Sequence, residues 1–105
     1  MATTEGILTL LPGGKKLVAV EVSSPTLVSG VVTLTLESVN KIDYVIGSVR
    51  VPVLTDTKVP AMVYEVGTAA NQIDVELSMG TSTAWADATT EDVADSILSF
   101  LVVGA

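Results

Sequence analysis

The chain of 105 residues contains neither cysteine nor histidine. Without cysteine it can form no disulfide framework, thiol nucleophile or zinc–thiolate site. Without histidine it lacks the commonest general base and metal ligand. Serine and threonine are plentiful, but no nucleophile–base pair can be assembled around them. We therefore expect no catalytic residue, no metal site and no cofactor, and we expect that the chain is not an enzyme.

Basic residues are scarce, and the last of them is Lys58. Five Lys and Arg stand against twelve Asp and Glu, a net charge of −7. Binding to a phosphate backbone needs clustered Lys and Arg, so we expect no nucleic-acid partner. The longest apolar runs are about half of what a bilayer-spanning helix needs, and no basic stretch followed by an apolar one marks a signal peptide. We therefore expect no membrane partner.

The residues that are present favour strands. Val, Ile and Thr make up about a third of the chain, and all three prefer extended backbone. The length fits one domain. Apolar residues reach 49%, whereas charged residues reach only 16% against a typical value of about 25%. This excess over what a small core can bury predicts association with copies of itself or with a larger assembly.

Alternating apolar and polar residues predict several short strands. The alternation is clearest in segments 15–22 and 31–37, and further strands are expected at 6–11, 42–53, 61–66, 73–79 and 96–103. The residues predicted to face inward are Val18, Val20, Val22, Val32, Leu34, Leu36, Met62, Tyr64, Val66, Ile73, Val75, Leu77 and Met79. About seven to eight short strands predict an all-β fold, an antiparallel β-sandwich or a jelly-roll-like small barrel, over residues 6–105. Residues 1–5, small and polar, are expected to form a flexible N-terminal arm.

Three further features of the sequence refine this prediction of strands. Gly47 interrupts segment 42–53 and predicts a bulge or a bend between two strands. Pro52 indicates an edge position near the end of that segment. Segment 80–95 is expected to lack strands, with one capped helical turn at 90–95.

Segment 96–103 is apolar on both of its alternating faces. Leu98, Phe100 and Val102 share one face, which we expect to fill the core. Ile97, Leu101 and Val103 share the other face, which needs cover from a second sheet or another subunit.

Other apolar residues lie in predicted loops. Trp85, the only tryptophan, can cap the sandwich core, anchor a protein contact or stack on a sugar ring. Leu27 and Val28 form an apolar pair inside the loop 23–30. The candidate interface residues are therefore Trp85, Ile97, Leu101, Val103, Leu27 and Val28.

Two groups of acidic residues are candidate sites. Asp74 and Glu76 lie on one face of a strand, where a glycosidase would need a close pair with one raised pKa, but the solvated half of an alternating strand explains them better. A second group in the long loop could offer oxygen ligands to calcium, but its spacing does not match a calcium-binding loop, and a solvated acidic loop is favoured. This second group is Asp87, Glu91, Asp92 and Asp95.

Several segments together resemble a known family. They are Pro12-Gly13-Gly14-Lys15-Lys16 leading into Val18, Val20 and Val22, then Ser23-Ser24-Pro25, Gly30-Val31-Val32-Thr33-Leu34-Thr35, Ile42-Asp43-Tyr44 and Leu98-Ser99-Phe100-Leu101-Val102-Val103-Gly104. In these segments, about half of the chain, it resembles the small all-β head decoration (cement) proteins of tailed bacteriophages. The segment that contains Trp85 lies outside the resemblance.

The resemblance implies a non-enzymatic virion protein that is made in the host cytoplasm and then lies on the outer surface of the capsid. Its implied partners are itself, as a homo-dimer or homo-trimer, and a major capsid protein, whose capsomer contacts it stabilises. The family supplies no active-site residues. The alternatives are a carbohydrate- or receptor-binding module of a phage fibre or spike, with Trp85, Tyr44 and Tyr64 as stacking groups, or another tail or virion structural component.

Overall fold

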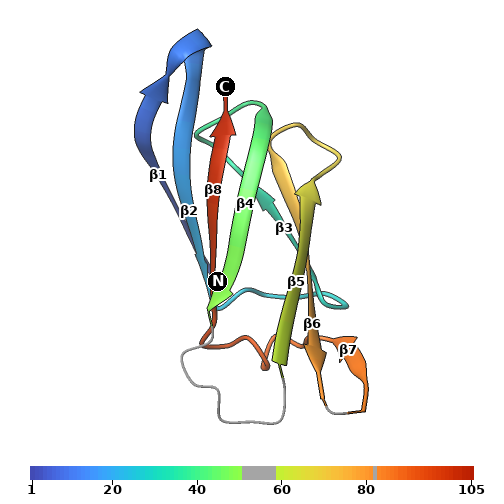
Figure 1. Cartoon of the computed structure of the whole chain (residues 1–105). Coiled ribbons are helices and arrows are strands. Elements are labelled where there is room, and N and C mark those ends of the chain that lie inside the picture. Colours follow the sequence, from blue (N-terminus) through green and yellow to red (C-terminus); the bar gives the residue numbers. More distant parts are fainter. Residues whose placement is uncertain (51–58, 82) are drawn as a thin grey trace.

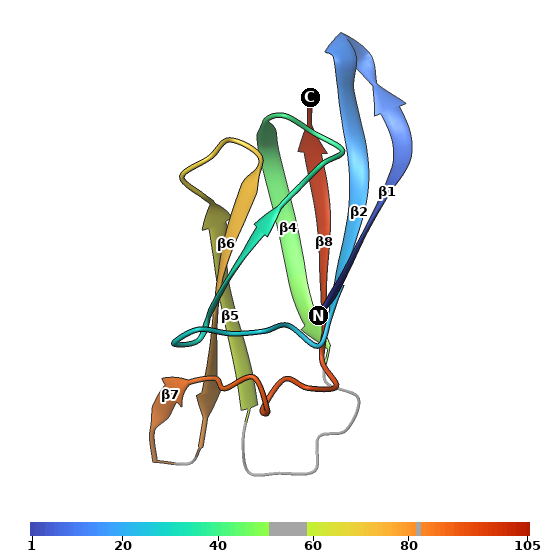
Figure 2. The same cartoon turned by 180° about the vertical axis from the view of Figure 1, so that it is seen from behind.

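The computed structural model describes residues 1–50, 59–81 and 83–105. These residues form two antiparallel sheets that pack against each other as a sandwich (Figures 1 and 2). The all-β sandwich predicted from the sequence is thus confirmed. In chain order the elements are β1 (Ala2–Leu11), the 3-10 turn η1 (Pro12–Gly14), β2 (Lys15–Ser23), β3 (Val31–Thr35), β4 (Ile42–Arg50), β5 (Val59–Val66), β6 (Gln72–Gly80), β7 (Trp85–Asp87) and β8 (Ile97–Gly104).

Sheet A has the strand order β1-β2-β8-β4, and sheet B has the order β3-β6-β5, with β7 paired to the end of β6. The last strand, β8, therefore lies in the middle of sheet A. It pairs with β2 from Lys16 to Ser23 and with β4 from Ile42 to Arg50. Both of its edges are hydrogen-bonded, so only its two faces remain to be covered.

The core consists of the inward faces of β2, β3, β6 and β8. The prediction that Leu98, Phe100 and Val102 fill it is confirmed, because they are 0%, 2% and 0% exposed. The predicted alternation in β2, β3 and β6 is confirmed as well by the buried residues Val18, Val20, Val22, Val32, Leu34, Leu36, Ile73, Val75 and Leu77. Met62, Tyr64 and Met79 pack partly buried against this cluster. Val66, also predicted inward, is 41% exposed at the end of β5.

Gly47 produces neither a bulge nor a bend, so that prediction is wrong. Strand β4 continues through Gly47, which lies opposite Phe100, and the register shift of this pair occurs between Ile42 and Tyr44 instead. A Cβ atom at position 47 would lie 2.5 Å from Cδ1 of the Phe100 ring. The glycine is there because the aromatic ring occupies the space that a side chain would need.

Residues 2–5 are not a flexible arm, because β1 begins at Ala2. This part of β1 pairs with β2, from Ala2 opposite Ser23 to Glu5 opposite Val20. The polar side chains of these residues do not prevent the pairing, since the ladder is made by the backbone.

The segment between β6 and β8 also differs in part from expectation. It contains the short strand β7, which pairs Trp85 with Gly80. Residues 90–95 form consecutive turns rather than a helix. Thr89 and Asp92 cap these turns reciprocally: each backbone N–H donates to the other's side chain, at 3.0 and 3.2 Å. The predicted edge position of Pro52 lies outside the described residues.

Candidate interaction surface

The outer side of sheet A is apolar at the end nearer the β1–β2 hairpin. Alternation along each strand turns one face of β2, β8 and β4 into the core and the other face outward. On the outward face, two neighbouring rows across these three strands are apolar. We call these six residues the apolar patch: Leu17, Val103 and Tyr44 in one row, and Ala19, Leu101 and Ile46 in the next.

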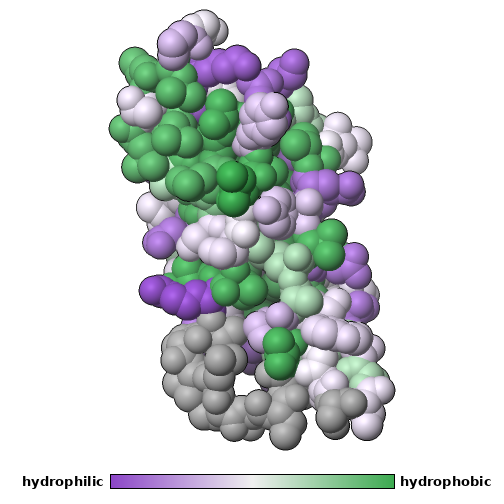
Figure 3. Space-filling model, viewed as in Figure 1, coloured by the Kyte–Doolittle hydropathy of each residue, from purple (hydrophilic) through white to green (hydrophobic). Residues whose placement is uncertain are grey.

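The apolar patch is substantially open to solvent. Tyr44 is 74% exposed, Ile46 68% and Leu101 47%. Figure 3 shows apolar side chains gathered over the part of sheet A that lies towards the hairpin. Single exposed apolar residues are ordinary, but a contiguous group of them marks an interaction surface. Sequence reasoning named Leu101 and Val103 and missed most of the others, although segment 42–46 already showed apolar residues on both faces.

Beyond the apolar patch the same face of sheet A becomes polar. The next row is Glu21, Ser99 and Ser48, and the row after it is Ser23, Ile97 and Arg50. Ile97 therefore lies on the same outward face as Leu101 but is separated from the apolar patch by a polar row. Within the described part of the chain the ion pair found is Lys15–Asp43 at 3.0 Å, so neither Glu21 nor Arg50 has an oppositely charged partner there.

A second apolar surface lies on β1. Ile7 is 52% exposed, Leu8 58% and Leu10 74%, and we call these three residues the hairpin tip. The register with β2 shifts between Ile7 and Thr9, which is where the strand bulges. The hairpin reaches beyond the other strands of sheet A (Figure 1). The far edge of β1 has no partner strand within the described chain.

The remaining predicted interface residues lie elsewhere. Trp85, on β7, is 61% exposed, and its ring packs over Gly80, where a Cβ atom would lie 2.7 Å from the indole. Trp85 therefore does not cap the core. Val28 is 76% exposed in a loop, while Leu27 beside it is partly buried against the core. The six predicted residues thus belong to several separate surfaces rather than to one site.

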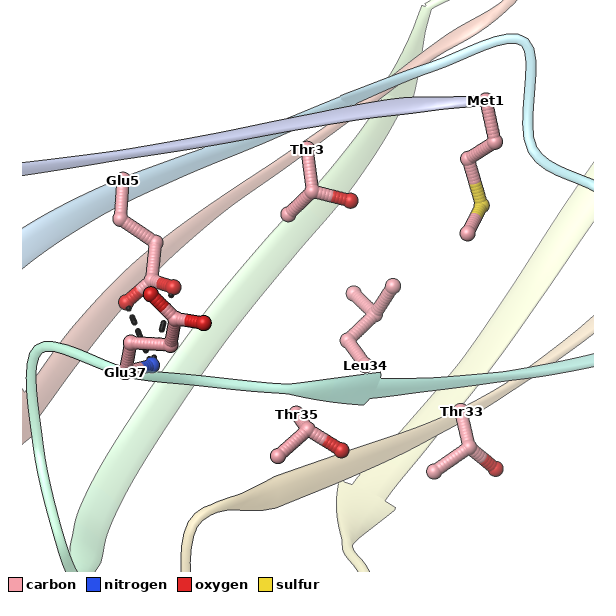
Figure 4. Close-up of a pocket in the computed structure, with 7 residues that line it drawn as sticks. All are labelled: Met1, Thr3, Glu5, Thr33, Leu34, Thr35 and Glu37. Atoms are coloured by element: carbon pink, nitrogen blue, oxygen red, sulfur yellow. Dashed lines mark hydrogen bonds between the residues drawn. The ribbon is translucent and has the colours of Figure 1, made fainter.

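A shallow pocket of about 390 Å³ lies where the edge strands β1 and β3 face each other. Figure 4 shows the seven residues that line it: Met1, Thr3, Glu5, Thr33, Leu34, Thr35 and Glu37. The ionisable side chains among these lining residues are the carboxylates of Glu5 and Glu37, beside the hydroxyls of three threonines.

Glu5 ties the two edges together across this pocket. Its carboxylate accepts hydrogen bonds from the backbone N–H of Glu37, at 3.0 and 3.1 Å, and from that of Ser38, at 2.9 Å (Figure 4 shows the bonds to Glu37). Partial burial raises the pKa of Glu5, but these backbone bonds, together with one from the Ser38 side chain, outweigh burial and leave the pKa lowered. The group is a structural link between the sheets.

The acidic candidate residues do not gather into one site. Asp74 accepts a hydrogen bond from the Thr33 hydroxyl at 3.0 Å on the outward side of sheet B, and Glu76 on the same face is exposed. Asp92 is engaged with Thr89 in the turn described above. Among residues 1–50, 59–81 and 83–105, no three carboxylates stand close enough to hold a metal ion.

The comparisons with known proteins add no relative. No family model matches the chain, and neither the curated proteins nor the solved structures contain a match. A separate finding concerns membranes: within the described residues, no helix has the length and apolar character needed to span one.

Proposed function

We propose that the chain is a non-enzymatic structural protein of a virus particle. Specifically, it is a decoration, or cement, protein that binds the outside of a phage head and stabilises the contacts between capsomers. The observation that carries this proposal is the exposure of apolar side chains on two separate surfaces, the apolar patch and the hairpin tip. Surfaces of this kind mark protein interfaces. The resemblance noted in the sequence supplies the nature of the partner, a major capsid protein.

The hairpin tip is the surface that suits the capsid. It extends past the rest of sheet A, and β1, which carries it, is an edge strand whose outer side pairs with no strand among the described residues. An edge strand of this kind can add to a strand of a partner, with its side chains supplying the specificity.

The mechanism needs no chemical step. A protein that binds only the assembled lattice stabilises that state over the unassembled one by mass action. Many copies, each with several contacts, make individually weak interfaces strong in sum. The net charge of −7 also suits a component that faces away from packaged DNA.

The carbohydrate-binding alternative gains no support from the positions of the aromatic residues. Tyr44 lies near the start of β4 and Trp85 on β7, at opposite ends of the sandwich (Figures 1 and 2). Tyr64 packs edge-on against Phe100, with ring centroids 5.6 Å apart. The three rings therefore share no platform on which a sugar could stack.

The test uses heads of the virus that encodes the chain, prepared without this protein. Adding the purified chain is expected to raise the temperature at which the heads release their DNA. Leu10→Asp places a charge on the hairpin tip and is expected to remove both binding and protection. Val63→Asp is the matched control, because Val63 is 69% exposed on sheet B, away from the hairpin. Heads that neither bind the unaltered chain nor gain protection would overturn the proposal.

A further inference from the structure

We propose that two copies of this chain pack through the outer sides of their A sheets, about a two-fold axis that runs parallel to β8. The occupant of the apolar patch is thus a second copy. This inference goes beyond capsid binding and does not depend on it, because it uses only the register of sheet A and the side chains that the sheet turns outward.

The outward side chains of sheet A are complementary in size under this symmetry. A two-fold axis along β8 places β2 of one copy over β4 of the other, at the same height along the strands. Ile46 then faces Ala19 of the copy, Tyr44 faces Leu17, and Leu101 faces its own counterpart. Ile46 and Tyr44 are thus each set against a smaller side chain, which lets two sheet faces interdigitate about 10 Å apart.

The charged side chains of the same face are complementary as well. Glu21 on β2 and Arg50 on β4 lie on the same outward face, on opposite sides of β8. Exchanging β2 and β4 brings Glu21 of one copy near Arg50 of the other, one row apart, or about 7 Å along the strands. The symmetry makes this pair twice. Within the described chain neither residue has an oppositely charged partner, so both are available for it.

The area of the paired faces approaches the range of stable protein interfaces. The axis pairs three strands, β2, β8 and β4, over four rows, which gives a footprint of roughly 400 Å² per copy. The accessible surface of a corrugated face exceeds its footprint, so the two faces together move from about 800 Å² towards the roughly 1,200 Å² at which stable interfaces begin. The interface has an apolar half and a polar half with one ion pair on each side, and each copy contributes the same surface, as a two-fold contact requires.

The test measures the oligomeric state by sedimentation equilibrium at micromolar concentration. The unaltered chain is expected to be a dimer. Ile46→Asp is expected to weaken the dimer by about a hundredfold or more, because symmetry counts the lost apolar contact twice. Tyr44→Ser is a milder second variant, and far-UV circular dichroism confirms that each variant is folded. Val63→Asp, on the other sheet, is expected to leave the dimer unchanged.

The axis is tested by reversing charges. Glu21→Arg and Arg50→Glu are each expected to weaken the dimer severalfold at low salt, because each places like charges together. The double variant is expected to restore the dimer. A monomeric or trimeric unaltered chain would overturn the proposal, as would equal effects of Ile46→Asp and Val63→Asp. A double variant weaker than both singles would refute the axis along β8.

The absence of cysteine from the natural chain allows a further check of the same axis. Ser99 lies on β8, between Glu21 and Ser48 in the register, and therefore near the proposed axis. Ser99→Cys is expected to cross-link to its own counterpart with a short bismaleimide. Glu76→Cys, on the outward face of sheet B, is expected to remain uncross-linked; the reverse pattern would contradict the arrangement.

Discussion

Replacing Gly47 by alanine tests how closely the two sheets are packed. Glycine in a strand interior is normally a weakness, so backbone entropy alone predicts that Gly47→Ala stabilises the fold by about 0.4–1 kcal/mol. The contact geometry predicts the opposite. The new Cβ atom would lie 2.5 Å from Cδ1 of Phe100 and 3.2 Å from Cε of Met62.

The ring of Phe100 cannot easily move away from this methyl group. Phe100 is 2% exposed, and Tyr64 packs edge-on against it. Overpacking of a well-filled core costs about 1–3 kcal/mol, which exceeds the entropic gain. We therefore expect Gly47→Ala to lower the free energy of unfolding by about 1–2 kcal/mol.

Gly6→Ala is the matched control, because Gly6 also lies inside a strand and a Cβ atom there meets nothing within 4 Å. It is expected to be neutral or to stabilise by a few tenths of a kcal/mol. Urea unfolding followed by far-UV circular dichroism measures both variants, with unchanged slopes indicating an unchanged denatured state. A Gly47→Ala protein as stable as Gly6→Ala would refute the packing argument.

Three further predictions concern the core and the carboxylates. Glu5→Gln is expected to cost about 1 kcal/mol at neutral pH, since the amide keeps one acceptor oxygen in place of two and removes the charge that strengthens the hydrogen bonds from two backbone N–H groups. The pKa of Glu5 is lowered in the folded chain, so the stability that its carboxylate contributes is present above the ordinary glutamate pKa and is lost as the pH falls through the lowered value. Urea midpoints of the unaltered chain and the variant that differ equally at pH 7 and pH 2.5 would contradict this expectation. Phe100→Asp is expected to abolish folding, because it buries an unpaired charge, and a native circular dichroism spectrum would count against the core assignment. Asp74→Asn is expected to change the midpoint by less than about 0.5 kcal/mol, since an amide oxygen can accept the same hydrogen bond on an outward face, and a loss above 2 kcal/mol would reveal an unrecognised role.

Which residues face inward could be predicted because alternation along a strand is a local property. In β2, β3 and β6 the pattern of apolar residues identifies the core directly, whereas β8 is apolar on both faces and its pattern alone does not. The neighbours of each strand are not a local property. Nothing in segment 96–103 indicates that β8 lies between β2 and β4, and without that pairing the apolar patch cannot be assembled from its three strands.

The errors have the same origin. The glycine at position 47 correctly indicates a local constraint within the strand. The constraint is the ring of Phe100 on β8, which lies more than 50 positions away in the chain. Residues 2–5 looked unstructured because their side chains are small and polar, whereas the backbone of β2 and the two N–H groups bound by Glu5 hold them in place. Long-range partners, not local propensity, decided both positions.

The central claim is that the chain is a structural component of a virus particle, and its presence in purified particles tests this most directly. Quantitative mass spectrometry of the particles should find the chain at a fixed ratio to the major capsid protein, on the order of hundreds of copies, because a symmetric shell repeats its binding site. Particles that lack the chain, or that carry only trace and variable amounts of it, would contradict the account.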